Sequence, residues 1–402
     1  MKNIPNLPMR IVAGGPLSEM LCGPIAPYSP LIIEFLSALS RELFLMPESR
    51  KYPDIAAFAF WCRNTNITRL SREFDGRHLR LGRGLVLHIA PGNVPINFAF
   101  TLAFGLLSGN ANIVRIAEKS FPQTEIISRK IDHLFQSSAY EKIAAMNRIV
   151  QYPRDDFITG ELSKRANARV LWGGDQTITH LRKLSISPRC VDISFADRYS
   201  IALLDVQAVL DETDIGMVRL AEGFFNDVYL QNQDACSSPH LLIWHGPATK
   251  AELAKQKFWA ALVKILREKY EIAPIDAVDK FVHLCRTATV LTEANSSIRH
   301  ENLAYRVQLI NLPNHIEDHR GRSGFFYEYT TDSFDFLQSI VNSRYQTLTC
   351  FGIDRNVLAR QIVNFGLTGI DRIVPIGKAL DMGVIWDGYD LIGTLTRVVY
   401  AS

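Results

Sequence analysis

GLVLHIAPGNVPINFAFTLAFGLLSGNANIVR, residues 84–115, is long, almost uncharged and interrupted by turn-forming residues at fixed points. Leu85–Ile89 predicts a buried strand and Ile96–Leu107 predicts a helix, and a Pro-Gly-Asn-Val-Pro turn separates the two. A Gly-Asn pair then stops the helix before a second strand, Ala111–Ile116. Because α/β proteins bind ligands at strand-to-helix turns of this kind, the turn is a candidate functional site.

Asn93 stands in the middle of that turn, where its side-chain amide can direct two N–H donors toward a ligand. The stretch is also long enough for a membrane-spanning helix. Pro91, Pro95 and His88 argue against a membrane span, because a Pro-Gly-Asn cluster breaks a helix near its start. We therefore expect a strand and a helix in the core of a globular protein.

The composition agrees with a globular protein of two or three domains, since 47% of the 402 residues are hydrophobic and 21% are charged. A net charge of +3 creates no strong field for nucleic acid. The basic residues near the N-terminus are not followed by the apolar core of a signal peptide. Six scattered cysteines show no CxxC pair and no metal-ligand spacing, which favours a cytoplasmic protein with free thiols and no metal site.

Strand and helix patterns alternate along the chain, which is typical of βαβ units and parallel sheets. Further strands are expected at Arg148–Tyr152, Ala168–Trp172 and Ser200–Leu204, and a helix at Phe121–Phe135. A second alternating stretch predicts a strand at Leu241–Trp244, a helix at Ala251–Tyr270 and a strand at Thr287–Leu291.

This alternation predicts an α/β fold with two Rossmann-like lobes and an active site in the cleft between them. We expect a cofactor-binding domain at residues 1–208 and a catalytic domain at residues 209–376. Residues 377–402 then pack back on the first domain or on a neighbouring subunit.

Cys236 lies in a polar loop, LQNQDACSSPH at residues 230–240, between a predicted helix and a predicted strand. Small neighbours leave room for a substrate and for backbone N–H donors, which lower the pKa of a thiol and favour a nucleophilic thiolate. Most other cysteines stand in apolar patterns typical of buried residues. His240 is a candidate activating base, although a histidine after proline at the start of a strand is more often structural.

Gly173 and Gly174 follow a predicted strand and precede a helix that begins near Asp175. Glycines permit a close approach of the backbone, and a helix N-terminus offers N–H groups to phosphate. The GxGxxG spacing of the usual dinucleotide site is absent. The same pattern also occurs as a tight turn with an aspartate cap.

Together these segments resemble the LuxC-like acyl-CoA reductases, a family within the aldehyde dehydrogenase superfamily. The resemblance extends from about residue 80 to the C-terminus and implies an aldehyde dehydrogenase-like fold. It is carried by LVLHIAPGNVPINFAF (85–100), FGLLSGNANIVR (104–115), RVLWGGDQTI (169–178), SFADRYSIALLD (194–205), NQDACSSPH (232–240), YQTLTCFG (345–352) and GIDRIVPIGKALDMGVIWDGYDLI (369–392).

The resemblance implies that Cys236 is the catalytic nucleophile and that the Asn93 amide and the Cys236 N–H form the oxyanion hole. Hydrolytic members carry a water-activating Glu where this chain has Ser194, or Asp192 if the alignment slips by two. Without that base, a thioester intermediate passes to hydride and not to water.

The resemblance also implies a cofactor site. Arg115 falls where relatives carry a Lys near the adenosine ribose, and Glu118 falls where they carry a ribose-binding Glu. Gly173 and Gly174 match the turn beside the pyrophosphate. Because an arginine there can pair with a 2′-phosphate, NADPH is favoured, with NADH as the alternative. The motif that positions the nicotinamide ribose is not recognisable, and Glu317 and Glu328 are loose candidates for its Glu.

The function implied is NADPH-dependent reduction of an acyl thioester, an acyl-CoA with a fatty chain favoured, to the aldehyde through a Cys-bound thioacyl intermediate. One alternative is a reductase of acyl groups delivered by a carrier protein or partner enzyme, and another is a catalytically silent scaffold. A homo-oligomer that binds no nucleic acid is expected. Four phenylalanines either line an acyl site or belong to the core: Phe98, Phe100, Phe224 and Phe225.

Overall fold

The opening stretch of sequence forms the centre of a six-stranded sheet. In the computed structural model, which describes residues 7–74 and 76–401, β3 (Leu85–Ile89) is followed by α5 (Asn97–Leu107) and β4 (Ala111–Ile116). Val86 of β3 packs on the side of α5, and Leu87 packs on the opposite side of the sheet. The stretch reads as nearly continuous apolar sequence because both faces of this parallel sheet are covered.

Buried polar side chains hold α5 onto the sheet. His88 Nδ1 lies 2.8 Å from the Thr101 hydroxyl, and His88 Nε2 lies 2.9 Å from the amide oxygen of Asn112. Burial lowers the pKa of His88 to about 4, so the ring is neutral and donates to Asn112 through Nε2. Gly105 makes this possible, because a Cβ at this position would overlap the Asn112 amide.

The sheet has the order β1-β5-β4-β3-β6-β7, and only the β1–β5 pair is antiparallel. The predicted strands of this region are confirmed to within a residue or two at each end. The remaining strands are β1 (Arg10–Ala13), β5 (Asn147–Gln151), β6 (Ala168–Trp172) and β7 (Val191–Phe195).

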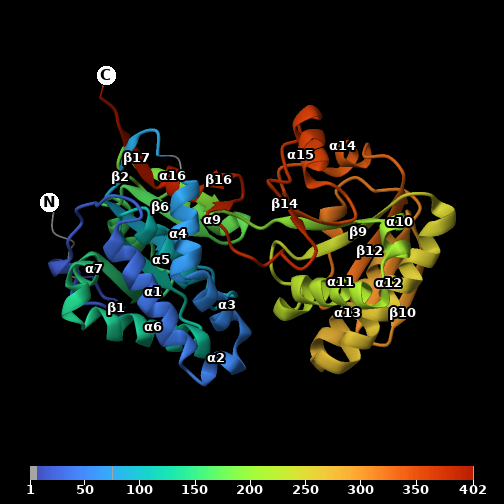
Figure 1. The fold of residues 1–402 in the computed structure, drawn as a ribbon, viewed down its shortest axis with the longest axis horizontal. Coiled ribbons are helices and arrows are strands. Elements are labelled where there is room, and N and C mark those ends of the chain that lie inside the picture. Colours follow the sequence, from blue (N-terminus) through green and yellow to red (C-terminus); the bar gives the residue numbers. More distant parts are fainter. Residues whose placement is uncertain (1–6, 75, 402) are drawn as a thin grey trace. The chain divides into compact units, whose positions relative to one another are not determined.

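Helices cover both faces of this sheet (Figure 1). One face carries α1, α5 and α6, with α3 and α4 outside them, and the other carries α8 and α9. The helices α1, α3 and α4, all before residue 80, thus form part of the core around this sheet. The helices are η1 (Leu17–Glu19), α1 (Pro30–Phe44), α2 (Glu48–Lys51), α3 (Pro53–Trp61), α4 (Asn64–Glu73), α6 (Pro122–Phe135), η2 (Ser138–Tyr140), α7 (Glu141–Met146), α8 (Asp156–Ser163) and α9 (Asp175–Arg182).

The end of the chain packs back on this first sheet. β17 (Thr396–Val399) pairs antiparallel with β2 (Leu79–Gly82), and the Asn110 side-chain amide donates to the Leu395 carbonyl at 2.9 Å. Arg83 donates to the Thr394 carbonyl at 2.6 Å. Three short elements precede β17 in the chain: β15 (Ile385–Trp386), β16 (Tyr389–Asp390) and α16 (Leu391–Thr394).

A second, seven-stranded sheet has the order β10-β11-β12-β9-β8-β13-β14, and only β10–β11 is antiparallel. Its strands are β8 (Tyr199–Asp205), β9 (Pro239–His245), β10 (Ala294–His300), β11 (Ala304–Leu309), β12 (Phe325–Thr331), β13 (Tyr345–Phe351) and β14 (Arg372–Pro375). Strand residues alternate between two cores, as Leu242 and Leu241 of β9 show.

Helices again cover both faces of the second sheet. α10, α11 and α12 build one core, and α13, α14 and α15 lie against the other. The helices of this region are α10 (Val206–Asp211), α11 (Asp214–Val228), η3 (Tyr229–Gln231), α12 (Ala248–Lys269), α13 (Pro274–Val290), η4 (Ile316–His319), α14 (Phe336–Ile340) and α15 (Arg355–Asn364).

The strand predicted at Thr287–Leu291 is wrong. These residues end α13, which begins at Pro274. The helix turns Thr287 inward, where its hydroxyl lies 3.0 Å from the Tyr327 hydroxyl, so packing on the sheet overrides the local preference of β-branched residues for strands.

The chain divides into two compact units. Unit 1 contains residues 1–196 and 382–402, and unit 2 contains residues 197–381. The sequence placed the first domain boundary later in the chain, after residue 208, and the second boundary earlier, after residue 376. The units divide elsewhere because β8 pairs with β9 and β13, and because the segment after β14 is held by groups of unit 2.

Candidate active site

The predicted site residues of unit 1, the catalytic Asn93 and the cofactor residues, lie at one edge of its sheet. Asn93 follows β3, Arg115 is near the end of β4, and Gly173 follows β6. The chain builds β3, β4 and β5 in one direction and then crosses to β6 on the other side of β3. This is a topological switch point, and ligands of doubly wound folds bind outside the carboxyl ends of strands at such a point.

Asn93 is exposed in the bend that follows β3. The bend is held from the side by α6, because the Thr124 hydroxyl donates to the Pro95 carbonyl at 2.8 Å. Gly92 passes close to β4, where a Cβ would lie 3.5 Å from the Ala117 side chain. The turn therefore places the exposed Asn93 beyond the carboxyl end of β3.

Arg115 is half-buried, and its side chain contacts Tyr152 of the same unit. Its guanidinium donates to the Tyr152 carbonyl at 3.0 Å and lies 5.4 Å from the centre of the Tyr152 ring. Burial lowers the pKa of Arg115, and the nearby Arg154 lowers it further while Glu118 opposes this. Glu118 is exposed beyond the end of β4.

Sequence reasoning missed Arg154. It stands in the turn between β5 and α8, four residues after Val150, which is the register partner of Arg115. Two guanidiniums from neighbouring strand ends suit a phosphate group, since arginine binds phosphate oxygens through several N–H donors. No local motif marks Arg154 in the sequence, because its relation to Arg115 depends on the pairing of β4 with β5.

Gly173 and Gly174 join β6 to α9 as predicted. The Gly173 N–H donates to the Phe195 carbonyl at 3.1 Å, and a Cβ on Gly174 would meet no atom within 4 Å. Gly174 is the N-cap of α9, and no side chain caps this end of the helix. Asp175 is therefore not the cap, and the helix N-terminus faces open space that suits a pyrophosphate.

These residues fit a nicotinamide dinucleotide. The uncapped N-terminus of α9 suits the pyrophosphate, and Arg115 and Arg154 suit a phosphate on the adenosine ribose. Glu118 is exposed beside them and can accept a hydrogen bond from a ribose hydroxyl.

Cys236 lies at the amino edge of the sheet of unit 2, in the loop before β9. Gln233 anchors this loop from within: its amide donates to the Pro239 and Phe325 carbonyls and accepts from the N–H groups of Gly324 and Phe325, all at 2.9–3.0 Å. The Ser200 hydroxyl donates to the carbonyl of Cys236 at 2.7 Å. The loop thus presents a half-buried thiol on a fixed backbone.

Burial makes most other thiols poorer nucleophiles. It raises the pKa of Cys190 and Cys350 to about 11 and also raises the pKa of Cys22 and Cys62. The fifth, Cys285, is exposed on α13.

His240 is fully buried and stacks on Tyr199, with ring centres 5.4 Å apart. Burial lowers the pKa of His240 to about 3, and the positive charges of Arg320 and Arg322 act in the same direction. A neutral buried imidazole of this kind is a weak base, so the structural role favoured by its position after a proline fits better than thiol activation.

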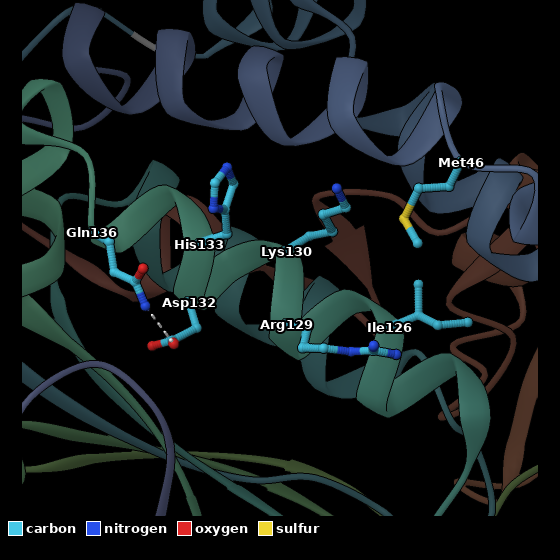
Figure 2. A pocket seen from close by; sticks show the side chains of 7 residues that line it. All are labelled: Met46, Ile126, Arg129, Lys130, Asp132, His133 and Gln136. Atoms are coloured by element: carbon cyan, nitrogen blue, oxygen red, sulfur yellow. Dashed lines mark hydrogen bonds between the residues drawn. The ribbon is translucent and has the colours of Figure 1, made fainter.

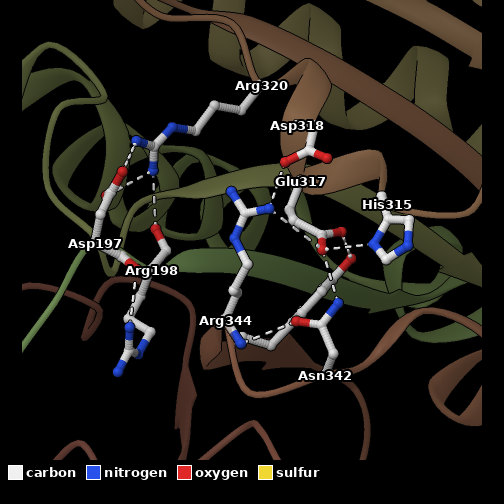
Figure 3. A network of polar contacts seen from close by, with 9 residues as sticks. Asp197, Arg198, His315, Glu317, Asp318, Arg320, Asn342 and Arg344 are labelled. Carbon is white, nitrogen blue, oxygen red and sulfur yellow. Dashed lines mark hydrogen bonds and ion pairs between the residues drawn. The ribbon is translucent and has the colours of Figure 1, made fainter. Parts of the chain in front are cut away.

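A polar network borders the same edge of unit 2 (Figure 3). Arg320 forms an ion pair with Asp197 and donates to the Arg198 carbonyl at 2.9 Å. Arg344 forms an ion pair with Asp318. The buried Glu317 carboxylate accepts from Asn342 at 2.7 Å and lies near His315 and Arg344. The network fixes the chain on both sides of η4. Its hydrogen bonds and ion pairs engage Glu317, one of the two glutamates considered for the nicotinamide ribose.

The other glutamate, Glu328, is also occupied. Its carboxylate is fully buried and accepts from Trp244 at 3.1 Å, Trp259 at 2.7 Å and Arg306 at 2.8 Å. Gln308 donates to it as well. A carboxylate with these partners belongs to the core and is not a ribose ligand.

Asp192 is held by Arg169. Two guanidinium nitrogens lie 2.8 and 2.6 Å from its carboxylate oxygens, and the Arg169 side chain is almost fully buried. A carboxylate in a bidentate ion pair is a poor water-activating base. Ser194 stands two residues along β7 and has no basic group in its side chain.

The four phenylalanines considered for an acyl site belong to the two cores. Phe100 packs edge-on against Phe58, and Phe98 lies in the same core. Phe224 and Phe225 lie in the core between α11 and α12. Their burial agrees with the structural alternative.

A shallow cavity of about 480 Å³ lies along α6, and none of the predicted site residues lines it (Figure 2). Most of its lining residues are polar or charged, and Lys130 is paired with Glu42 at 2.9 Å. The lining residues are Met46, Ile126, Arg129, Lys130, Asp132, His133 and Gln136. Within residues 7–74 and 76–401, no group of side chains is arranged to hold a metal ion. No helix in the described part of the chain is long and apolar enough to cross a bilayer.

Comparison with solved structures identifies the fold. The chain is similar to aldehyde dehydrogenase 21 from Physcomitrella patens, with a TM-score of 0.63 and 13% identity over 92% of this chain and 85% of the other. A lactaldehyde dehydrogenase matches with a TM-score of 0.61 and 12% identity over 93% and 87%. The two α/β units therefore have the fold of the aldehyde dehydrogenases, as expected.

The sequence places the chain more narrowly. The model of the acyl-CoA reductase (LuxC) family matches residues 67–398, and the chain belongs to this family. Two relatives named long-chain acyl-protein thioester reductase are each 26% identical, from Aliivibrio fischeri over 43% of this chain and from Vibrio harveyi over 48%. These matches span 35% and 37% of the relatives' own lengths. The family agrees with the expected class, an oxidoreductase acting on acyl groups.

Proposed function

We propose that this protein reduces an acyl thioester to the aldehyde with NADPH, through an acyl group carried on Cys236. The observation that carries the proposal is the position of Cys236: a half-buried thiol in a polar loop of fixed backbone, inside the stretch that matches the acyl-CoA reductases. Asn93, Arg115, Glu118, Gly173 and Gly174 keep the roles expected from the sequence.

The first half of the proposed reaction is acyl transfer to the protein. The Cys236 thiolate attacks the carbonyl carbon of the thioester, and the new carbon–sulfur bond pushes the carbonyl electrons onto oxygen. The Asn93 amide and the Cys236 N–H donate to that oxyanion. When the oxyanion collapses, the bond to the carrier sulfur breaks, and the released thiolate takes a proton from water.

The second half releases the aldehyde. When bound, NADPH supplies the hydride that reduces the acyl carbon on Cys236. The oxyanion of the resulting hemithioacetal is held by the same two donors, and its collapse breaks the bond to Cys236 Sγ and regenerates the thiolate. Neither Asp192, held by Arg169, nor Ser194 is suited to activate water against the acyl group.

Preference for NADPH is supported by Arg115 and Arg154, since a 2′-phosphate is the group that two guanidiniums at the edge beside the adenosine ribose suit. NADH is the alternative. A cytoplasmic homo-oligomer remains our expectation for the assembly.

A second donor class is favoured by the names of the two curated relatives, which describe acyl-protein thioester reductases. In this alternative the acyl group arrives on a carrier protein or on a partner enzyme, and Cys236 accepts it by the same transfer. A catalytically silent scaffold is the third hypothesis.

The test is consumption of NADPH with a panel of acyl-CoA chain lengths and the matching acyl-carrier-protein thioesters. We expect turnover with the native protein and loss by at least about 10³-fold in Cys236→Ala, since the nucleophile carries both halves of the reaction. Cys285→Ala, which removes an exposed thiol of the same unit, serves as the control and keeps native activity.

Mass spectrometry separates the hypotheses further. Without NADPH, the native protein should gain the mass of the acyl group on the peptide that contains Cys236. Turnover retained in Cys236→Ala would overturn the site, and an absence of adduct with every donor would favour the scaffold.

A further inference from the structure

Arg372 and Cys236 occupy the same edge of the sheet of unit 2. Arg372 begins β14 and is the register partner of Thr347 in β13. The Thr347 N–H donates to the Ser200 hydroxyl at 3.2 Å, and that hydroxyl donates to the Cys236 carbonyl at 2.7 Å. Two hydrogen bonds and one strand pairing thus connect the two residues across β13 and β8.

A second set of contacts connects Cys236 with the segment after Arg372 from the side of α11. The Ser238 hydroxyl, two residues after Cys236, donates to the Asp227 carbonyl at 2.6 Å. The Asp227 carboxylate accepts from the N–H groups of Gly377 at 2.6 Å and Ala379 at 2.8 Å. Gly223 permits this approach, because a Cβ there would lie 3.2 Å from the Gly377 backbone.

The segment held by these contacts also fixes the Arg372 guanidinium. It donates to the carbonyls of Ala379 at 2.6 Å, Lys378 at 2.7 Å and Asp381 at 2.7 Å. Burial lowers the pKa of Arg372, and the groups that oppose this by their negative charge are Asp381, Asp227 and the Cys236 thiol. The cation is thus half-buried, immobilised and within electrostatic range of the sulfur.

The other charges near Cys236 have partners of their own. Arg322 lies 3.5 Å from Asp234, and Arg320 is paired with Asp197. His240 is neutral, and burial raises the pKa of Asp227 to about 7. The charged or titratable groups of unit 2 on this loop and on the elements packed around it include Asp234 of the loop itself, Asp276 of α13, Arg320 and Arg322 before β12, Asp227 of α11, His240 of β9, and Arg372, Lys378 and Asp381 at the end of unit 2.

We propose that Arg372 is a positioning residue that stabilises the Cys236 thiolate and so prepares the nucleophile of the proposed reaction. A fixed guanidinium within electrostatic range of a sulfur favours the ionised form of the thiol. The inference rests on the proposed function, but it concerns the thiol alone and predicts a property that needs neither thioester nor cofactor to be measured.

The experiment measures the rate of iodoacetamide alkylation of Cys236 against pH, by mass spectrometry of its peptide. We expect Arg372→Gln to raise the apparent pKa of Cys236 by about one unit and Arg372→Lys, which keeps the charge, to raise it less. Arg344→Gln removes another arginine of the same edge, one that pairs with Asp318, and leaves the value unchanged. The exposed Cys285 should be alkylated at the same rate in all variants.

A folded Arg372→Gln protein whose Cys236 titrates at the native pH would overturn the inference. Asp227→Asn provides a measurement in the opposite direction, since it leaves Arg372 in place and removes the neighbouring carboxylate. Here the apparent pKa of Cys236 should fall, and an unchanged value also counts against the inference, even if the glutamine variant does not fold. Loss of turnover without a change of alkylation pKa would assign Arg372 a purely structural role, whereas turnover retained in Cys236→Ala would overturn the proposed function instead.

Discussion

At the scale of single residues, the proposed chemistry depends on a sulfur atom and an amide. Cys236 gains its place from a loop that Gln233 anchors at its base, and Asn93 gains its place from a bend held by Thr124. Asn93 stands in a Pro-Gly-Asn-Val-Pro turn, and Cys236 stands in a polar loop with small neighbours. This is why the sequence identified them without knowledge of the fold.

Replacement of Asn93 by alanine should slow thioester reduction, because one of two proposed oxyanion donors is lost. Removal of such a donor typically raises the barrier by about 3–4 kcal/mol, so we expect a fall of kcat by about 10²–10³-fold. Steady-state NADPH oxidation measures the effect, and Asn64→Ala, at an exposed amide of the same unit, is the control. An unchanged kcat would show that Asn93 is not a donor to the oxyanion.

Asp227 should make the stability of the protein depend on pH. Burial raises its pKa from 3.8 to about 7, so between these values the folded state holds a proton that the unfolded chain has lost. The stability that this proton contributes is therefore present near pH 4 and is lost as the pH rises through 7.

Asp227→Asn should remove this dependence. Urea midpoints measured from pH 4.5 to 8 should decline less steeply in the variant, by the equivalent of about one proton. Asp211→Asn, at an exposed carboxyl of α10, should keep the native slope. Parallel curves for the native protein and Asp227→Asn would mean that this carboxyl titrates normally.

At the scale of elements, the sequence predicted the parallel strands of unit 1 better than it predicted the end of helix α13 in unit 2. β3, β4 and β6 were found at their observed bounds because glycine, proline or asparagine borders each apolar run on at least one side. The end of α13 was read as a strand, since Thr287 and its neighbours are β-branched and the contact with Tyr327 that turns them inward is distant in sequence.

Two helical glycines of unit 1 should respond in opposite ways to alanine. In α5, a Cβ on Gly105 would overlap Asn112 and lie 2.9 Å from His88 Nε2, so Gly105→Ala should destabilise the protein by about 2 kcal/mol or more. In α8, a Cβ on Gly160 would meet nothing within 4 Å, so Gly160→Ala should stabilise it by about 0.5–1 kcal/mol. Thermal denaturation midpoints of the two variants give the comparison. A shift in the same direction would contradict the packing described around α5.

At the scale of the whole molecule, the site was only partly visible in the sequence. Cys236, Asn93, Arg115 and the glycine turn each lie in a recognisable local motif. Arg154 and Arg372 do not, because their relation to Arg115 and Cys236 comes from strand pairings that bring separate segments into register. Sequence spacing carries no information of that kind.

Nucleotide binding should stabilise the protein and report on the phosphate preference. A ligand at about 100 times its Kd adds about 2.7 kcal/mol to the stability of the state that binds it. We expect adenosine 2′,5′-bisphosphate to raise the denaturation midpoint more than adenosine 5′-monophosphate, and Arg154→Gln to abolish the difference. Arg129→Gln, at an exposed arginine of α6, should preserve it. Equal shifts with both nucleotides in the native protein would favour NADH.

The division of the chain also sets an order of assembly during synthesis. Unit 2 is one uninterrupted stretch, whereas unit 1 needs residues 382–402, which are synthesised after all of unit 2. Until they emerge, β2 has no strand beside it and Asn110 lacks the carbonyl of Leu395. A nascent chain stalled near residue 381 would therefore contain a complete unit 2 joined to a unit 1 with an open edge, and such an edge is where chaperones or aggregation act first.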